Sequence, residues 1–403
     1  MTNLPLERTI KGLGIMANQK LSTLEQRLSL LVAMPTETRR REACRQAIES
    51  IVEELKSLGL FVTTYPGQHP SLIATTKKTK KPKLMLVAHM DVVPANDPSQ
   101  YEPKIIGNRF IGRGAYDMKF AIASYLEFLN NNTQNLKEYD LGIMITTDEE
   151  IAGDDGAGMI LKEGWRAEVA FIPDSSTPWH IEEKSKGRMV IELEALGRSA
   201  HSSRPHEGTN ALQKIINVVN ELEEKYPIRE PEDLTAITTN IGGGVADNQI
   251  PDHAKASIDL RAFDSVEMAD ASTFIQSSCR KHKVQYKIIQ DKKPLILDKN
   301  NPHVKLFCKS YESVIYKKSR FNQAYGGTDG EWFARYNIPC IIISPRGSDF
   351  HGPQEYVNRD DLPIFYRLMV DFINRLHDID TSKQPEMLGK SSLIRRVLER
   401  VRY

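Results

Sequence analysis

The chain has 403 residues, 40% of them hydrophobic and 27% charged, which is typical of a soluble globular protein large enough for two domains. Its formal net charge of +1 at pH 7 argues against nucleic acid or an anionic membrane surface as the main partner. No segment reaches the roughly eighteen consecutive apolar residues of a membrane span, and no signal-peptide core is visible, so no membrane partner is expected.

The four cysteines lie far apart in the sequence and form no CxxC pair. This spacing argues against a thiolate zinc site and against a dithiol redox motif. Cysteines of this kind are typical of buried free thiols in a reducing compartment, so we expect a cytoplasmic protein. The four are Cys44, Cys279, Cys308 and Cys340.

Between about residues 22 and 182 the chain alternates helix-like and strand-like patterns. Such alternation predicts an α/β fold, in which a mostly parallel sheet is flanked by helices. Ligands of such sheets gather at the carboxyl ends of the strands. The expected elements are helices at 24–31, 47–58 and 121–129 and strands at 84–88 and 141–146.

The pattern changes between about residues 186 and 291, where strands and amphipathic helices follow one another in a βαββαβ-like order. We expect an α+β domain of ferredoxin-like type, inserted into the α/β domain. The predicted division is 1–185 for the first part of the α/β domain, 186–291 for the insertion, and 292–403 for the second part with a tail helix at 393–401. The other expected elements are strands at 189–196, 254–260, 284–289 and 338–344 and helices at 211–222 and 307–314.

The most informative segment is MLVAHMDVVPA, residues 85–95, in which an apolar run ends in a histidine and an aspartate. His89 and Asp91 are two residues apart, so both project to the same side where the strand ends. A metal-binding imidazole needs its second nitrogen held by a carboxylate, which Asp91 could supply. Taken alone, the pair is equally compatible with a structural histidine at a strand end.

Four further polar clusters interrupt the α/β pattern: GRGAYDMK with Asp117, TTDEE with Glu149 and Glu150, IPDSS with Asp174, and FHGPQEYV with His351. Histidines and carboxylates without cysteine are the ligand set of a hydrolytic zinc or cobalt pair. Such pairs hold two metals about 3.5–4 Å apart to activate water and polarise a carbonyl. Each cluster alone has another explanation, since Asp117 could cap a helix and the glutamates could lie in a solvated loop.

In their order along the chain, HMD, GRGAYDMK, TTDEE, AHSSRP and HGPQEY resemble the motifs of the aminoacylase, succinyl-diaminopimelate desuccinylase and acetylornithine deacetylase family of dinuclear zinc metallopeptidases. That family also includes bacterial-type glutamate carboxypeptidase and cytosolic dipeptidases. The resemblance covers about residues 22 to 378. It implies a zinc-peptidase-like catalytic domain, an inserted lid that also forms a homodimer, and two bound zinc ions, with cobalt possible.

Metal ligands can be carried over onto the matching positions of this sequence. The resemblance implies that His89 and Asp174 bind one metal. His351 and Glu150 would bind the other, and Asp117 would bridge the two.

The resemblance also implies catalytic roles. Asp91 would orient His89, and Glu149 would be the general base. A base must take up a proton and return it, whereas a ligand must stay deprotonated, which favours different roles for adjacent glutamates. His201, in the segment GRSAHSSRP, resembles the lid histidine that stabilises the oxyanion in the partner subunit's site.

Substrate-binding residues follow from the same resemblance. Asn248 and Arg261 resemble lid residues that bind the substrate carboxylate, although Arg261 could also be a structural arginine on a strand. Gly327 and Thr328 resemble a backbone contact to the same end of the substrate.

Three segments depart from the family pattern, and in the first of them Phe120 and Ala121 follow the DMK signature where family members often have two glycines. Asp174 stands where deacylases usually have glutamate and several dipeptidases have aspartate, and Glu182 and Glu183 lie close downstream as alternative ligands. Arg346, in SPRGS, could bind a second carboxylate or lie in a solvated loop.

The expected function is that of a metal-dependent amidohydrolase that cleaves an amide next to a free carboxylate. It would release an amino acid from an N-acyl-amino acid or a small peptide, and the choice between a deacylase and a dipeptidase or carboxypeptidase stays open. Two other hypotheses are a catalytically silent binding relative and a hydrolase of a different bond, such as a carbamoyl amide.

Overall fold

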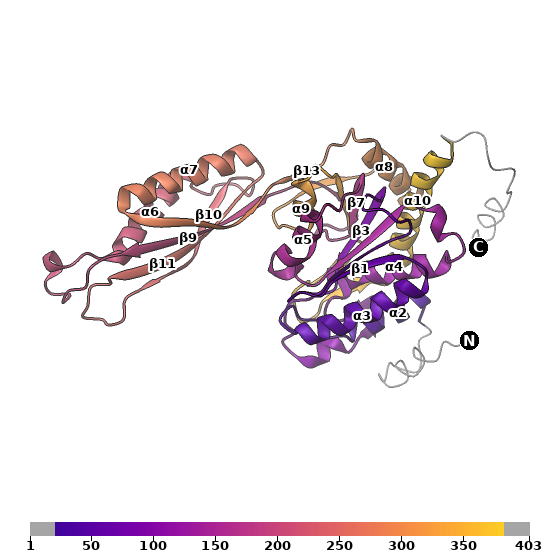
Figure 1. The fold of residues 1–403 in the computed structure, drawn as a ribbon, viewed down its shortest axis with the longest axis horizontal. Helices are drawn as coiled ribbons and strands as arrows, with labels where there is room; N and C mark the ends of the chain where they lie inside the picture. Colours follow the sequence, from indigo (N-terminus) through magenta and orange to yellow (C-terminus); the bar gives the residue numbers. More distant parts are fainter. Residues whose placement is uncertain (1–20, 383–403) are drawn as a thin grey trace.

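The computed structural model describes residues 21–382, and the tail helix predicted at 393–401 lies outside this range. Figure 1 shows two bodies: a main body, formed by residues 21–186 and 293–382, and an elongated arm, formed by residues 187–292. Within the described residues, no helix is long and apolar enough to cross a membrane.

A six-stranded sheet forms the centre of the main body, with the strand order β1-β2-β6-β3-β7-β15. The pairs from β6 to β15 are parallel, whereas β1 and β2 are antiparallel to their neighbours, which confirms the predicted mostly parallel α/β fold. Every residue of β3 and β6 is buried because both faces of the sheet are covered. The strands are β1 (Phe61–Tyr65), β2 (Ser71–Thr75), β3 (Leu84–His89), β6 (Leu141–Thr146), β7 (Val169–Ile172) and β15 (Cys340–Ile342).

The two faces of this sheet contribute to separate hydrophobic cores. In β3, Leu84 and Leu86 belong to one core, and Met85 and Val87 belong to the other, as the alternation of strand side chains requires. A capping box of Ser22 with Glu25 begins the first described helix. The helices are α2 (Thr23–Val32), α3 (Arg41–Ser57), α4 (Phe120–Asn131), α8 (Pro302–Ile315) and α10 (Asp361–Ser382) on the first face, and α5 (Met159–Lys162) and α9 (Gly330–Ala334) on the second.

Two small sheets complete the main body. In one of them β17 pairs with β5, so that Tyr356 lies opposite Ile111 and the segment after residue 351 lies beside the segment before residue 117. The strands are β4 (Lys104–Ile106), β5 (Arg109–Ile111), β16 (Gly347–Ser348) and β17 (Tyr356–Asn358) in this sheet, and β8 (Ile181–Ser185), β13 (Leu295–Ile296) and β14 (Phe321–Ala324) in the other.

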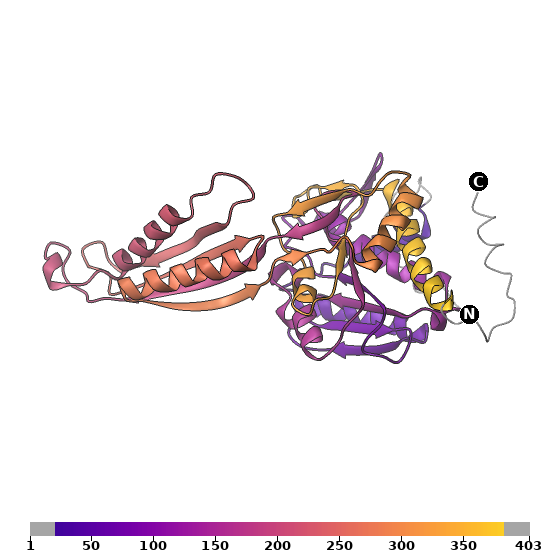
Figure 2. The ribbon, with the colours of Figure 1, turned by 90° about the horizontal axis from the view of Figure 1, so that it is seen from above.

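The arm has the βαββαβ order expected from the sequence, and its antiparallel strands are arranged β10-β11-β9-β12. Strand β9 alternates buried and more exposed residues, because α6 and α7 cover one face of this sheet and share a core with it (Figure 2). Asn210 caps α6 by accepting the backbone N–H of Gln213. The elements are β9 (Gly187–Leu196), α6 (Ala211–Lys225), β10 (Thr235–Gly243), β11 (His253–Ala262), α7 (Ser265–His282) and β12 (Val284–Lys292).

The strand register defines the two ends of the arm. Gly187 pairs with Ala262 at the end next to the main body, and Leu196 pairs with His253 at the far end. A strand of ten residues, the length of β9, spans about 30 Å. The loops 197–210 and 244–252 therefore lie at the far tip of the arm.

Candidate metal centre

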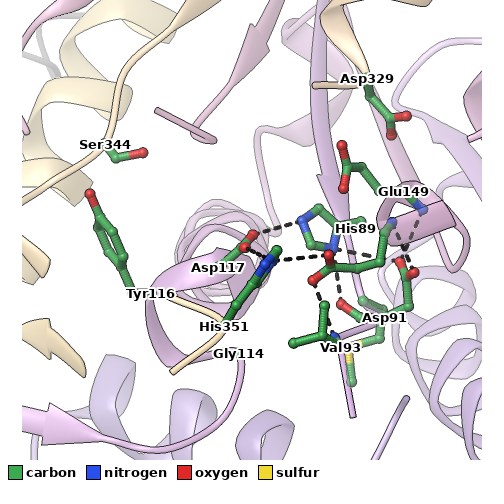
Figure 3. A network of polar contacts seen from close by, with 12 residues as sticks. His89, Asp91, Val93, Gly114, Tyr116, Asp117, Glu149, Asp329, Ser344 and His351 are labelled. Carbon is green, nitrogen blue, oxygen red and sulfur yellow. Dashed lines mark hydrogen bonds and ion pairs between the residues drawn. The ribbon is translucent and has the colours of Figure 1, made fainter. Parts of the chain in front are cut away.

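The candidate centre lies at the carboxyl ends of three neighbouring parallel strands (Figure 3). His89 is the last residue of β3, Glu149 and Glu150 follow β6, and Asp174 follows β7. Because parallel strands end at the same edge of a sheet, three separate segments deliver these side chains to one place.

The ring of His89 is held by hydrogen bonds at both nitrogens. Its Nδ1 lies 2.9 Å from the backbone carbonyl oxygen of Asp91 and 3.5 Å from the Asp91 carboxylate, so the carbonyl is the nearer acceptor. Its Nε2 lies 3.0 Å from Oδ1 of Asp117. A carbonyl oxygen can only accept, so Nδ1 carries a proton; Nε2 donates to Asp117 when the ring is protonated, and in the neutral ring it would present its lone pair to a cation.

Asp117 lies between two imidazoles, with one carboxylate oxygen toward each (Figure 3). Its Oδ2 is 3.1 Å from Nε2 of His351, which also lies 3.0 Å from a carboxylate oxygen of Glu150. His351 is in a loop between β16 and β17 and has a left-handed backbone, with φ of 63°. The structure thus brings together His89, Asp117, Glu150 and His351.

Two buried aspartates shape the loop that carries the glutamates. The Asp91 carboxylate accepts the backbone N–H groups of Glu149 and Glu150, each at 3.3 Å, and the hydroxyl of Thr38 at 2.8 Å. Asp148 accepts two more backbone N–H groups, from residues 155 and 156, at 2.8 and 3.0 Å. The backbone of this loop is therefore fixed from both sides.

Glu355 has a structural role that the sequence analysis did not identify. Its buried carboxylate accepts backbone N–H groups from Gly114, Tyr116 and Asp117 and the guanidinium of Arg113, at 2.8 to 3.1 Å. Arg113 also donates to the backbone carbonyl oxygen of residue 351 at 3.0 Å. This buried pair therefore connects the Asp117 turn to the His351 loop. In the sequence, Arg113 lies in the motif GRGAYDMK and Glu355 in FHGPQEYV, and this was the only signal for their pairing.

The close packing of charged groups shifts their pKa values. Hydrogen bonds to Asp117 and Glu150 raise the pKa of His351 to about 10. Burial opposes the same effect at His89, but contacts with Asp117 and Asp91 still raise the pKa of that imidazole well above its usual range. Burial raises the pKa of the Glu149 carboxyl well above its usual range. Such a concentration of perturbed groups in a cleft is typical of a functional site.

The donor set fits divalent metals. Ligand atoms of His89, Asp117 and Glu150 all lie within 4.8 Å of one another, and so do those of His89, Glu149 and Asp174. Imidazole nitrogens and carboxylate oxygens suit zinc and cobalt, and each histidine here faces a carboxylate that the same cation could bind.

A cleft of about 210 Å³ opens beside these residues. Its lining includes Asp117, Glu149, Glu150, Asp174 and His351, together with the predicted Gly327 and Thr328. The Glu331 carboxylate lies directly where a side chain on residue 327 would begin, so a larger residue here would require that carboxylate to move. Other lining residues that the sequence analysis did not assign to the site are Tyr116, Ser175, Ser176, Ser344 and Phe350.

Glu182 also lines the cleft, and it is 1% exposed. Burial raises the pKa of its carboxyl to about 8. It belongs to neither group of clustered ligand atoms, whereas Asp174 does.

Three predicted residues of the arm lie outside this cleft. His201 and Asn248 are exposed at the far tip, where the backbone N–H of residue 202 donates to the Asn248 carbonyl oxygen at 2.9 Å. Arg261 lies at the near end, bonded to Asp259 at 2.8 Å and 3.5 Å from the carbonyl oxygen of Tyr325. The structure therefore brings none of the three into the cleft of its own chain.

Arg346 is also outside the cleft. Its guanidinium forms an ion pair with Asp361, the buried first residue of α10, and its side chain is 58% exposed. The arginine thus joins a loop to a helix end.

A family model described as peptidase family M20/M25/M40 matches residues 85–375, well over half of the chain and the whole of the polar centre. The chain belongs to this family. The resemblance seen in the motifs is thereby confirmed, and the protein is an M20 family metallohydrolase.

Relatives of this M20 family protein include two bacterial enzymes. A succinyl-diaminopimelate desuccinylase of Rickettsia bellii is 24% identical over 338 residues, covering 77% of this chain and 85% of the relative. A succinyl-diaminopimelate desuccinylase of Pelagibacter ubique is 26% identical over 318 residues, covering 70% of this chain and 79% of the relative.

Several solved structures share the fold. A tripeptidase from Staphylococcus aureus superposes with a TM-score of 0.72 at 21% identity, covering 88% of this chain and 98% of that one. An M20 metallo-carboxypeptidase from Sulfolobus solfataricus superposes with a TM-score of 0.71 at 17% identity, covering 89% of this chain and 100% of that one. A dinuclear metal-binding M20 peptidase from Bacillus subtilis superposes with a TM-score of 0.64 at 15% identity, covering 88% of this chain and 99% of that one.

Proposed function

We propose that this M20 protein is a dinuclear metal-dependent amidohydrolase, which cleaves an amide next to a free carboxylate and releases an amino acid. The observation that carries the proposal is the position of Asp117, whose two carboxylate oxygens lie 3.0 and 3.1 Å from the imidazoles of His89 and His351. A carboxylate placed in this way can bridge two cations, each held by one histidine.

The proposed ligands divide into two sets around that bridge. His89 and Asp174 would hold one ion and His351 and Glu150 the other, with zinc or cobalt as the metal. When bound, such a pair activates a water molecule and polarises the scissile carbonyl. Clustering of Asp174, rather than Glu182, with His89 supports the choice of Asp174 as the fifth ligand.

Glu149 is proposed as the general base. It lines the cleft on the side of His89 and Asp174, whereas its neighbour Glu150 lies 3.0 Å from the ring of His351. Burial raises the pKa of its carboxyl, which makes the carboxylate a better acceptor for a proton from water, a proton that it would later give to the leaving amine. The backbone hydrogen bond to Asp91 would position Glu149 for this transfer.

The arm is proposed to act between two subunits. His201 and Asn248 lie at the tip, about 30 Å along the strands from the main body of their own chain. In a homodimer formed through the arms they would serve the partner's cleft, where His201 would stabilise the developing oxyanion. Arg261, beside the loop that holds Gly327 and Thr328, would bind the substrate carboxylate.

The substrate is proposed to be a small N-acyl-amino acid or a short peptide. The names of the relatives support both, because the similar sequences include desuccinylases and the similar structures include a tripeptidase and a carboxypeptidase.

A substrate panel tests the proposal. The purified protein, with zinc or cobalt added, would be incubated with N-acetyl-amino acids, N-succinyl-amino acids and dipeptides, and the released amino acids would be measured with ninhydrin. We expect release from at least one class, abolished by a chelator and restored by metal. No release from any class would contradict the proposal.

A further inference from the structure

Glu182 is a buried carboxylate that the proposed metal centre leaves unused. It is the second residue of β8, it is 1% exposed, and its Oε2 has no hydrogen-bond partner. The next residue, Glu183, is different, since its side chain is 38% exposed and lies 2.7 Å from the ammonium of Lys299. One of two adjacent glutamates thus has a cation, and the other faces the cleft without one.

Glu182 has a hydroxyl partner in Ser175, but among the described residues it has no cationic one. Within residues 21–382, no lysine, arginine or histidine forms an ion pair with it. The nearby hydroxyl of Tyr116 donates instead to the carbonyl oxygen of Ser175, at 3.1 Å. Leaving a carboxylate oxygen buried and unpaired is costly, so a residue of this kind in a cleft indicates a missing donor.

Metal ions do not explain this carboxylate. The carboxylates assigned to the centre are those of Asp117, Glu149, Glu150 and Asp174, and each of them belongs to a group of clustered ligand atoms. Glu182 lies outside both groups of clustered ligand atoms, so the two proposed ions leave its unpartnered oxygen without a donor. The missing donor is therefore expected to come from the substrate, and a cationic donor would also stabilise the ionised carboxylate.

We propose that Glu182 binds a protonated primary amine of the substrate. The inference rests on the proposed amidohydrolase function and narrows it to substrates that carry an amine as well as the scissile amide. An ammonium group supplies several N–H donors and the matching charge. It could be the free amino terminus of a short peptide or the side-chain amine of the released residue, because both present the same group to a carboxylate.

Two matched ligand pairs separate these sources. L-Alanyl-L-alanine and N-propionyl-L-alanine differ only by the terminal amine. N-propionyl-L-lysine and N-propionyl-L-norleucine differ only by the side-chain amine. Binding of all four would be measured by calorimetry on the zinc-loaded Glu149→Gln protein, in which hydrolysis is suppressed, with Glu182 intact or replaced by glutamine. Glu183→Gln in the same background is the control.

With Glu182 intact, the amine-bearing member of one pair should bind about 10- to 100-fold tighter than its partner, as expected for a hydrogen bond between charged groups. Glu182→Gln should abolish this preference without weakening the amine-free ligand, and Glu183→Gln should preserve it. Elemental analysis should find unchanged zinc in the Glu182→Gln protein.

The proposal is overturned if neither amine-bearing ligand binds tighter, if the preference survives Glu182→Gln, or if that variant loses a zinc ion and is thus a ligand mutant. A wild-type protein that hydrolyses nothing would contradict the proposed function instead. The binding comparison would still decide the role of Glu182.

Discussion

The carboxylate of Asp91 accepts a hydrogen bond from the backbone N–H of Glu149, at 3.3 Å. The other carboxylate oxygen does the same for Glu150. The nearest acceptor for the ring of His89 is the Asp91 backbone carbonyl. One residue therefore fixes the histidine through its backbone and the glutamate loop through its side chain.

Asp91→Asn should weaken the site without unfolding the protein. Asparagine keeps one acceptor oxygen, but its amide group would face one of the two glutamate N–H groups and repel it. Turnover or metal affinity should fall about 10- to 100-fold, the usual cost of losing a group that supports metal ligands. Metal titration and steady-state kinetics would measure this, with Asp154→Asn, an exposed position in the same loop, as the control. Unchanged behaviour of Asp91→Asn would refute the positioning role.

Adjacent glutamates should respond differently to the same substitution. Glu149→Gln should keep the fold and both metals but lower turnover at least about 100-fold, because the amide cannot carry the proton. Glu150→Gln should instead reduce the metal content, because it removes a ligand. Elemental analysis and kinetics on the two variants check this contrast. If Glu149→Gln lost metal and Glu150→Gln did not, the two roles would have to be exchanged.

His201→Ala should lower turnover about 10²- to 10³-fold at unchanged metal content, the usual effect of losing an oxyanion donor. His206→Ala, a nearby exposed substitution, should have little effect. If His201 serves the partner's cleft, mixing His201→Ala with Glu149→Gln subunits under conditions that allow exchange should restore about a quarter of wild-type activity through heterodimers with one intact site. A mixture as inactive as its components would exclude action between subunits.

Glu221 should make a pH-dependent contribution to the stability of the arm against unfolding. On α6, this carboxylate accepts from Ser278, Lys281 and His282 of α7, and these contacts lower its pKa from 4.5 to about 2. A lowered carboxyl pKa stabilises the fold above the unfolded value of about 4.5, and this stabilisation is lost as the pH falls toward 2.

Thermal unfolding of Glu221→Gln tests this effect. Its melting temperature should lie below that of the wild type at pH 7, and the difference should shrink as the pH falls below about 4.5. High salt should also reduce this difference in melting temperature, because the Glu221 carboxylate is partly exposed and its ion pairs are screened. Glu223→Gln, on the exposed side of α6, is the control. A difference that is constant from pH 7 to pH 3 would rule out the charge as its cause.

Apolar patterning predicted the longer elements well. The strand at 141–146 has the expected bounds because it is an apolar run buried on both sides. The strand expected at 338–344 is only Cys340–Ile342, because its one neighbour, β7, offers partners only from Ala170 to Ile172. The extent of a strand at the edge of a sheet depends on its partner, which the local sequence does not reveal.

The residues of the centre were predictable mainly because their motifs occur in a recognisable order. Contacts between segments far apart in the sequence could not be predicted in this way. The acceptor role of Glu355 toward the Asp117 turn joins positions more than 200 residues apart. Likewise, the sequence did not distinguish Glu182 from Glu183, because their difference comes from the burial of one and the ion pair of the other.

Metal stoichiometry, measured by elemental analysis of the purified protein after loading with zinc or cobalt, tests the central claim most directly. Two ions per chain are expected from the two histidines and three carboxylates assigned as ligands, and His89→Ala and His351→Ala should each lower that number. A protein that binds no metal and gains no hydrolytic activity when metal is added would contradict the account and favour a catalytically silent relative.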